Sequence, residues 1–348
     1  MIPDTERSFM RKFITALLCA FTAVATATYF TACTRPAAEN GVNLVAVEGG
    51  QVGLMHGVDY YVVPEPAASA RVSALKDLNI VGDLQEIYGG ENGYPQAVIV
   101  AKTGVLEHGA FMRRFIAALG RNGEWLADEH TSAETVVSAV REHLTDGASP
   151  MFTAENLTKQ VIENCGIGFV PAAEGKREIK AFMEKLDGVS ETPFGTPSDG
   201  FFHDGEYGAD ESNPKVSVYA PDGAPALGIA NLLAGEENLQ DCAEIEYEVV
   251  AASLIQTFVT GANPKADICV LPVNLAVKLL GNGGAYKLIG TLTHGNLFLL
   301  SENGERITAD NFDTLKGKTV GVVNLAAVPG LTFKLILKEH GVEYKQVV

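Results

Sequence analysis

The sequence predicts an α/β fold, and three observations support this prediction. Short runs of apolar and β-branched residues alternate with longer segments whose apolar residues recur every three to four positions. Pro/Gly-rich turns separate many of these runs from the helical segments. The chain has 348 residues, 47% of them hydrophobic, which is enough for one large or two medium domains. Strands that alternate with helices favour parallel sheets covered on both faces, with ligands at the carboxyl ends of the strands.

The first half of the chain contains clear helix signals. Apolar side chains at Phe111, Phe115 and Leu119 have helical spacing. Ser132, followed by an early acidic residue and Val/Ala periodicity, predicts an N-cap. Thr153 is the predicted N-cap of the next helix. The expected strands are 42–47, 59–63 and 94–102, and the expected helices are 64–76, 104–127, 131–144, 153–166 and 175–188.

The second half repeats the alternation, and its first strand and helix resemble the opening of a mature domain. A long strand is expected to break at His294-Gly295. The expected strands are 215–219, 244–250, 266–272, 286–301, 316–324 and 342–348, and the expected helices are 224–234, 253–260, 273–281 and 328–341.

Residues 190–214 join the two halves. This segment is rich in proline, glycine and acidic residues and has no apolar period, so it reads as a solvated linker. Its acid spacing faintly resembles a calcium loop. However, Ala209 stands where an EF-hand has its glycine, and the terminal glutamate of such a loop is absent. We expect the linker to run over the protein surface.

The N-terminal 33 residues predict export and lipid anchoring. A basic region is followed by the apolar stretch 13–27, which is short for a membrane span. Small residues at Thr31 and Ala32 precede Cys33, as a lipoprotein signal peptidase requires. The alternatives are an ordinary signal peptide with an incidental cysteine and an N-terminal membrane anchor. Translation from Met10 would leave the same signal.

Charge and cysteine content exclude some functions. The net charge of -17 leaves no excess of Lys and Arg to neutralise phosphates, so nucleic acid is excluded as a partner. Cys165, Cys242 and Cys269 in the mature chain form no CxxC pair, and we expect them to be free thiols.

No catalytic motif is present, but one arrangement occurs four times. The sequence has no HExxH and no GxSxG, and its histidines lack metal-ligand spacing, so we predict neither an enzyme nor a metal or cofactor site. Four apolar strands each end in a short turn that opens a helix, and such turns present free backbone N–H groups to a polar ligand. They are "VYAPDGAPA", "CVLPVNLA", "GVVNLAAVPG" and "YVVPEPAA".

Five segments carry a resemblance to a known family. They are "KVSVYAPDGAPALGIANLLA", "TFVTGANPKADICVLPVNLAVKLL", "YKLIGTLTHGNLFLL", "LKGKTVGVVN" and "VDYYVVPEPAAS". Together they resemble ABC-transporter solute-binding lipoproteins, in particular the group that captures nitrate, taurine, alkylsulfonates or thiamine-pyrimidine precursors. The resemblance implies a two-lobed periplasmic-binding-protein type 2 (Venus-flytrap) fold that closes on one small molecule.

The order of the segments departs from the family. The block resembling 215–348 comes first in the family, and the block resembling 41–200 follows it, so the chain looks circularly permuted. A gene-assembly artefact would give the same order. Permutation would place Val348 near Asn40–Gly41. The implied organisation is signal peptide 1–33, tether 34–40, first part of lobe two 41–120, lobe one 121–295 and second part of lobe two 296–348.

The resemblance also implies cleft residues. Glu65 would hold a cationic or amide-bearing part of the ligand, or it would cap the helix that starts at Pro66. Tyr94 and Tyr61 would stack on a ring, or they belong to the core. The remaining positions carried over are Asp222, Gly223, Ala224, Pro225, Asn274, His294, Gly295, Asn296, Asn324, Ala326, Ala327 and Val328.

The expected function is therefore binding and delivery. A lipid-anchored protein of this kind would capture a small polar or heteroaromatic molecule outside the cytoplasm and pass it to the permease subunits of an ABC importer. An enzyme of thiamine-pyrimidine synthesis with the same fold is one alternative, and it would need a reactive histidine and a cysteine-rich stretch. A lipid-anchored ligand sensor without a permease is the other.

Overall fold

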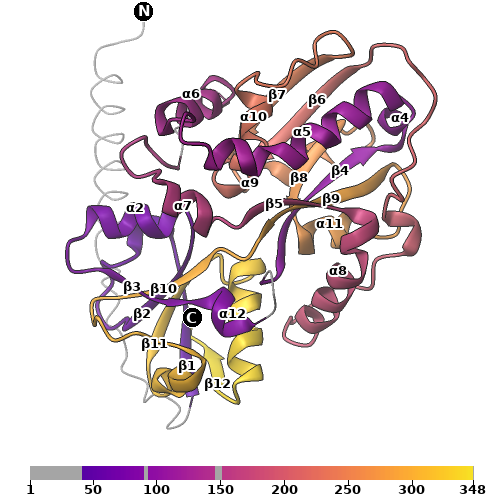
Figure 1. The fold of residues 1–348 in the computed structure, drawn as a ribbon. Helices are drawn as coiled ribbons and strands as arrows, with labels where there is room; N and C mark the ends of the chain where they lie inside the picture. The colour runs from indigo at the N-terminus through magenta and orange to yellow at the C-terminus, as the bar shows by residue number, and fades with distance from the viewer. Residues whose placement is uncertain (1–40, 90–92, 146–150, 348) are drawn as a thin grey trace, which may run out of the picture. The chain divides into compact units, whose positions relative to one another are not determined.

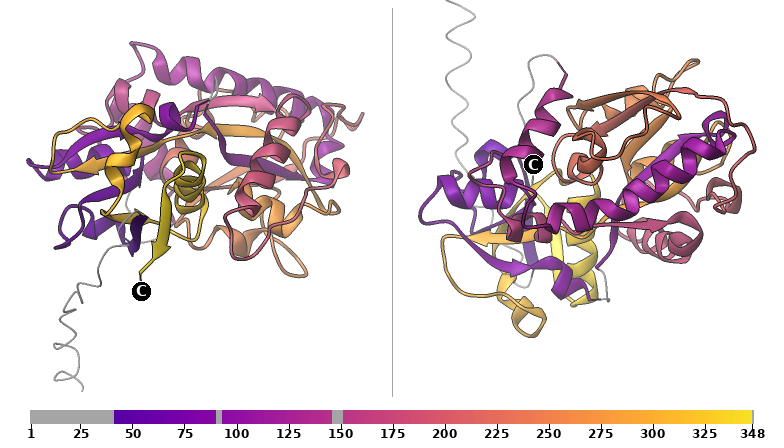
Figure 2. Two further views of the ribbon diagram at one scale, coloured as in Figure 1. Left: turned by 90° about the horizontal axis from the view of Figure 1, so that it is seen from below. Right: turned by 45° about the horizontal axis from the view of Figure 1, so that its top comes forward.

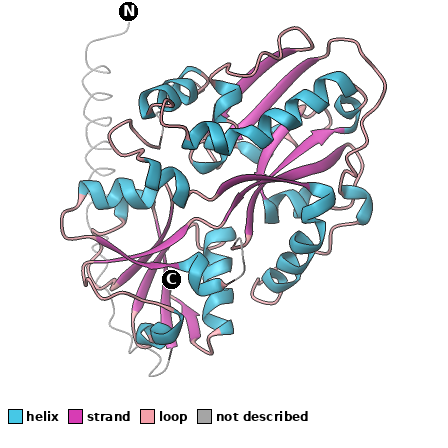
Figure 3. Ribbon diagram, in the orientation of Figure 1, coloured by secondary structure: helices cyan, strands magenta, loops and turns pink. Residues whose placement is uncertain are grey.

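Two six-stranded sheets with helices packed against them form the described part of the chain (Figure 1). The structure is a computed structural model, and it describes residues 41–89, 93–145 and 151–347. The first sheet has the strand order β12-β1-β11-β2-β10-β3, and the second has the order β5-β9-β4-β8-β6-β7. Figure 3 shows helices along both sheets. The predicted α/β class is confirmed.

The strands fall close to the expected runs, with two additions, β3 and β5, that the sequence did not predict. The first sheet contains β1 (Gly41–Val47), β2 (Tyr60–Pro64), β3 (Asn79–Asp83), β10 (Leu297–Ser301), β11 (Thr319–Val323) and β12 (Glu343–Gln346). The second sheet contains β4 (Pro95–Lys102), β5 (Ile167–Pro171), β6 (Lys215–Pro221), β7 (Glu244–Val250), β8 (Ile268–Pro272) and β9 (Tyr286–His294).

The helices agree less closely with the expected ranges. The longer ones are α2 (Ala67–Ala74), α5 (Gly109–Ala127), α6 (Ala133–Glu142), α8 (Ala172–Asp187), α11 (Val273–Leu280) and α12 (Val328–Glu339). The short ones are α3 (Leu84–Tyr88), α4 (Thr103–Leu106), α7 (Lys159–Asn164), α9 (Ala224–Leu227) and α10 (Ala230–Leu233).

Capping explains where two of the helices begin. Ser132 accepts a hydrogen bond from the backbone N–H of Thr135 at 3.1 Å, so the predicted N-cap of α6 is confirmed. The prediction of Thr153 as the next N-cap is wrong. Thr158 caps α7 instead, by accepting from the N–H of Val161 at 3.2 Å, while Thr153 opens a turn. Both threonines are suitable caps, and only the residues that follow Thr158 form a regular helix.

Two other predicted helices are interrupted. The range 224–234 divides into α9 and α10, because the backbone of Ile229 between them is not helical. In place of a helix over 253–260, the chain forms a 3-10 turn at Ile255–Phe258.

Strands from the two halves of the chain pair with each other. Val218 of β6 lies opposite Ile268 of β8 in a parallel pair. Val320 of β11 lies opposite Tyr60 of β2, also in parallel. Each sheet therefore contains strands from before and after the linker, and neither half of the chain forms a sheet of its own.

The two ends of the described chain lie close together. β1 and β12 are parallel neighbours, and the N–H of Val347 donates to the carbonyl of Leu44 at 2.8 Å. The indigo and yellow strands accordingly lie side by side in Figure 1 and in the left view of Figure 2. The predicted proximity of Asn40 and Val348 lies outside the described residues.

The prediction of parallel sheets is wrong, because both sheets are mixed. β10 runs antiparallel to β2 and β3, and β4 runs antiparallel to β8 and β9. β9 leaves the second sheet and continues into β10 of the first sheet after only two residues, Gly295 and Asn296. With no crossover helix between them, β10 enters the first sheet at the edge where β2 ends, and it must run antiparallel to β2.

The chain changes sheets twice. It passes from the first sheet to the second between α3 and β4, and it returns between β9 and β10. The expected boundary at residue 120 is therefore wrong, since β4 and α5 belong to the second sheet. The apolar run of β4 did not show which sheet it joins, because its pairing partners, β8 and β9, lie more than 160 residues later.

The core continues from one sheet to the other. β4 is buried on both faces: Ile99 belongs to the apolar cluster that includes residues of α5 and α6, whereas Val98 belongs to the cluster that includes residues of α8 and α11. The cluster that contains Val98 extends through Phe182 of α8 to α12 and the adjoining face of the first sheet. A smaller cluster with Ala68 of α2 covers the opposite face of the first sheet.

Residues 190–214 are packed more closely than a solvated linker would be. Phe201 is fully buried and Phe202 is 8% exposed, and the N–H of His203 donates to the carbonyl of Leu288 in β9 at 2.9 Å. Asp199 forms ion pairs with Lys180 and with Lys176, the latter at 3.0 Å. These hydrogen bonds lower the pKa of Asp199 to about 2. The composition of the segment did not indicate that it is anchored to the core, because only two of its residues, Phe201 and Phe202, supply the buried rings.

The predicted signal peptide, tether and lipidated Cys33 lie outside the described residues. Within the described ranges, none of the helices combines the length and the apolar character needed to cross a bilayer.

Candidate functional site

The candidate site lies where the carboxyl ends of strands from both sheets come together. In the second sheet, β6, β7 and β8 are parallel, and β9 runs in the same direction because it and β8 both pair antiparallel with β4. Ala97 of β4 lies between Pro272 and Thr293. Asn274, after β8, and His294, the last residue of β9, are thus at the same edge of the sheet. Asp222, after β6, belongs to this edge as well.

The first sheet presents the same kind of edge. β2 and β11 are parallel, so Glu65 and Asn324 follow strands that end together. β10 begins at this edge, with Leu297 opposite Pro64. Asn296, just before β10, therefore lies beside Glu65, and the Glu65 N–H donates to the Asn296 carbonyl at 2.8 Å.

The segment His294–Asn296 joins the two edges, and we call it the crossing. The N–H of His294 donates to the carbonyl of Gly166, after α7, at 2.8 Å. The N–H of Gly295 donates to the carbonyl of Tyr94 at 2.8 Å. The two segments that connect the sheets, one before β4 and one between β9 and β10, are therefore hydrogen-bonded to each other through Tyr94 and Gly295.

Close packing at the crossing requires glycine at two positions. Gly166 and Gly295 have φ values of 61° and 59°, which side chains other than glycine rarely adopt. A methyl group at Gly166 would overlap the carbonyl oxygen of His294, and one at Gly295 would overlap the side chain of Gln85. A side chain at either position would push the connecting segments apart.

Glu65 is the one acidic side chain of the predicted set that is fully buried, with 2% of its surface exposed. Its carboxylate accepts from the N–H of Ser69 at 2.9 Å and from the Ser69 hydroxyl at 2.6 Å. The expected capping role is thus confirmed, since Ser69 lies in the first turn of α2. The same carboxylate also accepts from the side-chain amide of Asn164, at the end of α7, at 3.4 Å. Glu65 therefore joins elements that pack on different sheets.

Asn296 is also 2% exposed and lies against Glu65. Its side-chain N–H donates to the carbonyl of Glu65 at 3.2 Å. The other half of the amide, the oxygen Oδ1, is buried and has no hydrogen-bond partner in the structure. Buried polar atoms of this kind are rare, and each one marks a place where a donor is missing.

His294 is half-buried at the end of β9. Burial lowers the pKa of its imidazole below the ordinary value of 6.5, because the charged form loses hydration. The ring is therefore neutral at pH 7, and the crossing carries no cationic side chain of its own.

The turn after β6 is held by its own carboxylate. Asp222 accepts from the N–H of Gly223 at 2.7 Å and from the N–H of Met151 at 2.8 Å. Burial raises the pKa of this carboxyl group. Ala224 is buried and Pro225 is half-buried in the first turn of α9. Asp222 thus fixes the turn and the Met151 backbone rather than presenting a free acid.

The turns after β8 and β11 differ in exposure. Asn274 is 7% exposed, and its side-chain oxygen accepts from the N–H of Leu275 at 2.8 Å. Asn324 is exposed and left-handed, with a φ of 56°, and its carbonyl accepts from the N–H of Ala327 at 2.9 Å. Ala326 is exposed as well, whereas Val328 at the start of α12 is buried.

The two tyrosines belong to the core, which was the alternative to a ligand-stacking role. Tyr94 has no exposed surface, stacks on Phe182 with ring centroids 5.4 Å apart, and donates to Gln85 at 3.3 Å. Tyr61 is 3% exposed, and its hydroxyl is bonded to the backbone of Met55. The prediction that they stack on a ligand ring is wrong for this conformation, because neither face is accessible.

The sequence did not reveal four polar residues of this region. Asn164 and Ser69 contact the Glu65 carboxylate. Gln85 accepts from the N–H of Leu297 at 2.6 Å and thereby ties α3 to the start of β10. Gln96, beside Pro95 at the start of β4, has a buried side-chain oxygen without a partner. A single-sequence pattern carries no signal for Asn164 and Gln85, because each contacts a residue far away in the chain.

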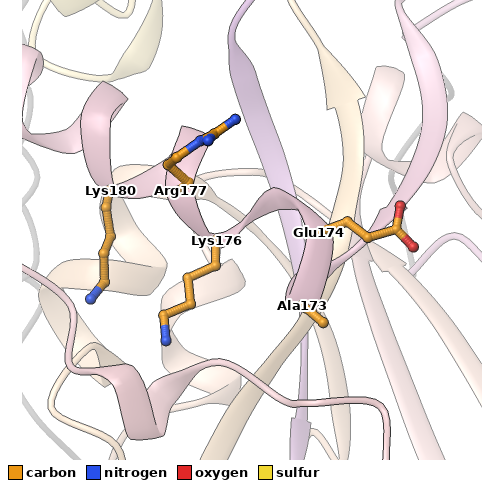
Figure 4. Close-up of a pocket in the computed structure, with 5 residues that line it drawn as sticks. All are labelled: Ala173, Glu174, Lys176, Arg177 and Lys180. Atoms are coloured by element: carbon orange, nitrogen blue, oxygen red, sulfur yellow. The ribbon is translucent and has the colours of Figure 1, made fainter.

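A separate hollow of about 410 Å³ lies on α8 (Figure 4). No residue predicted for the site lines it. Two of its cations, Lys176 and Lys180, are already paired with Asp199. The hollow therefore attracts an anion less strongly than its three cationic residues suggest. The lining residues are Ala173, Glu174, Lys176, Arg177 and Lys180.

Cys165, Cys242 and Cys269 are buried and unpaired, as predicted. Across the described ranges, no three His, Cys, Asp or Glu side chains gather as a metal-ligand set.

Comparisons with known proteins identify no family. No protein-family model matches the chain. No curated protein matches it either.

Solved structures give weak similarities to substrate-binding proteins of ABC transporters. A periplasmic oligopeptide-binding protein from Thermotoga maritima is 16% identical, with 65% of this chain and 38% of that one covered and a TM-score of 0.25. The oligopeptide-binding protein AppA from Bacillus subtilis, solved with a nonapeptide, is 14% identical, with 77% and 57% covered and a TM-score of 0.28. The chain thus spans less than two thirds of either protein. Neither belongs to the nitrate and taurine group, and TM-scores of this size establish nothing about the fold or ligand of this chain.

Proposed function

We propose that this chain is an extracytoplasmic solute-binding protein that captures one small polar or heteroaromatic molecule and delivers it to an ABC permease. The observation that carries the proposal is the meeting of both carboxyl edges at His294–Asn296. Ligands of open α/β sheets bind outside the carboxyl ends of the strands. Here two such edges adjoin, and the predicted turns after β2, β6, β8 and β11 end at them.

In this proposal each sheet with its helices forms one lobe of a type 2 periplasmic-binding-protein fold, with the halves of the chain in permuted order. Two segments connect the lobes, one before β4 and one between β9 and β10. A pair of connections is compatible with hinge closure around a ligand. The core shared through α8 and α12 would lie at the pivot. Lipidation of Cys33 would keep the protein at the outer face of the membrane, beside its permease.

The test is a thermal-shift screen of nitrogen, sulfur and pyrimidine compounds. A ligand at one hundred times its Kd should stabilise the protein by about 2.7 kcal/mol, because it binds only the folded state. The compound should then be recovered unchanged by mass spectrometry after prolonged incubation. Accumulation of a product would indicate an enzyme instead, and the absence of any stabilising compound would contradict a solute-binding role.

A further inference from the structure

The Glu65 carboxylate is buried without a cationic partner. It is 2% exposed, and its hydrogen bonds come from Ser69 and Asn164, which are neutral. No Lys, Arg or His of the described ranges pairs with it. Removing a carboxylate from water is costly unless the charge is compensated. A cation next to Glu65 would supply the missing compensation.

Asn296 provides a second and independent observation. Its side-chain oxygen is buried, has no partner, and belongs to the amide group that donates to the Glu65 carbonyl. An acceptor left unpaired in this way is destabilising, because it loses its hydrogen bond to water and gains none in the folded protein. An acceptor that lacks a donor thus belongs to a residue that is hydrogen-bonded to the backbone of Glu65 at the crossing.

The amide of Asn164 is a weak partner for Glu65. The N···O distance of 3.4 Å is at the long end for a hydrogen bond, and Asn164 is only half-buried. It also comes from α7, which packs with the helices of the second sheet. A donor from a ligand could replace it without loss of the Ser69 bonds.

We propose that the Glu65 carboxylate binds a cationic N–H donor group of the ligand, an ammonium, amidinium or guanidinium, and that Asn296 accepts a second N–H from it. The amide of Asn164 occupies this position when no ligand is bound. Amidinium and guanidinium suit it best, because their paired N–H groups match two acceptors at once. This inference rests on the proposed function and narrows the ligand class. A nitrate or sulfonate group would face acceptors only, and it is not bound here.

Three probes of the same shape test the charge preference. Benzamidinium, benzamide and benzoate differ in charge but share the ring, and binding of each to the purified protein is measured by calorimetry and thermal shift. We expect benzamidinium to bind at least tenfold more tightly than benzoate, a difference of about 1.4 kcal/mol. Tighter binding of benzoate would overturn the inference. So would the absence of benzamidinium binding up to about 10 mM, a concentration high enough to detect a Kd of about 1 mM.

Two variants with the same charge change locate the effect. Glu65→Gln should weaken benzamidinium binding at least tenfold, whereas Glu163→Gln, at the exposed residue before Asn164, should leave it unchanged. Equal affinity of Glu65→Gln and the unchanged protein would refute the role of Glu65.

Further variants separate binding from helix capping. Ser69→Ala removes the hydroxyl bond to Glu65 but keeps its charge, so it should lower stability and preserve benzamidinium binding. Asn164→Ala should strengthen benzamidinium binding, because the amide that competes for Glu65 is removed. This variant tests the site even if Glu65→Gln does not fold. Weaker binding in Asn164→Ala would contradict the inference.

The outcomes also distinguish this inference from the proposed function. If an anion such as benzoate stabilises the protein and Glu65→Gln has no effect, the solute-binding role stands and the ligand class is wrong. If no compound of any charge in the wider screen binds, the proposed function itself fails.

Discussion

Replacing Phe201 with alanine tests whether the segment 190–214 is part of the folded core. The Phe201 side chain has no exposed surface, and it lies edge-on to Phe202 with ring centroids 5.8 Å apart. Removing a fully buried phenylalanine ring costs about 3–5 kcal/mol, through lost burial and the cavity left behind. That is a large share of the roughly 5–15 kcal/mol that stabilises a typical protein.

The assay is urea unfolding followed by the fluorescence of Trp125, the single tryptophan, which lies in α5 beside the second sheet. Phe194→Ala is the matched control, because Phe194 lies in the same segment but is only half-buried. We expect the free energy of unfolding to fall by about 3 kcal/mol or more for Phe201→Ala and by clearly less for the control. Equal losses, or a loss below about 1 kcal/mol for Phe201→Ala, would show that the segment is a loose linker after all.

Three further predictions follow from the crossing and the N-terminus. Gly166→Ala should lower stability by at least about 1 kcal/mol, because alanine is strained at a φ of 61°, and an unchanged melting temperature would contradict this. Burial lowers the pKa of His294 in the folded state, so the unfolded state binds more protons and stability should decline as the pH falls below about 6.5. His294→Asn should flatten this profile, whereas His130→Asn, at an exposed histidine, should not; identical profiles for the two variants would exclude His294 as the cause. Cys33→Ala should leave an unprocessed or soluble precursor, and palmitate label on that variant would refute lipidation at Cys33.

The sequence predicted most of the strands because their signal is local. Continuous apolar runs such as those of β4 and β8 are rich in Val, Ile and Leu, and this composition suits a strand that is buried on both faces. β3 and β5 were missed because they are short and contain glycine or proline, as in NIVGD and IGFVP. Which sheet β4 joins depends on its pairing partners β8 and β9, which are distant in the sequence. The local pattern of β4 therefore does not predict its sheet.

The candidate site was predicted only in part for the same reason. Turns that follow strands are visible in the sequence, so Glu65, His294 and Asn296 were found. Asn164 was not, because its contact with Glu65 joins residues 99 positions apart and comes from the last position of a short helix. The sequence also suggested that Tyr94 is available to a ligand, since aromatic residues in the core and in a cleft have the same local pattern.

Hydrogen exchange with and without a stabilising compound tests the central claim most directly, namely that a ligand binds where the two carboxyl edges meet. The account predicts that protection on binding concentrates in 65–70, 164–166, 222–228, 294–297 and 324–331, which contribute residues from both sheets. Protection confined to 173–180, around the hollow on α8, or to the turns of a single sheet would contradict it.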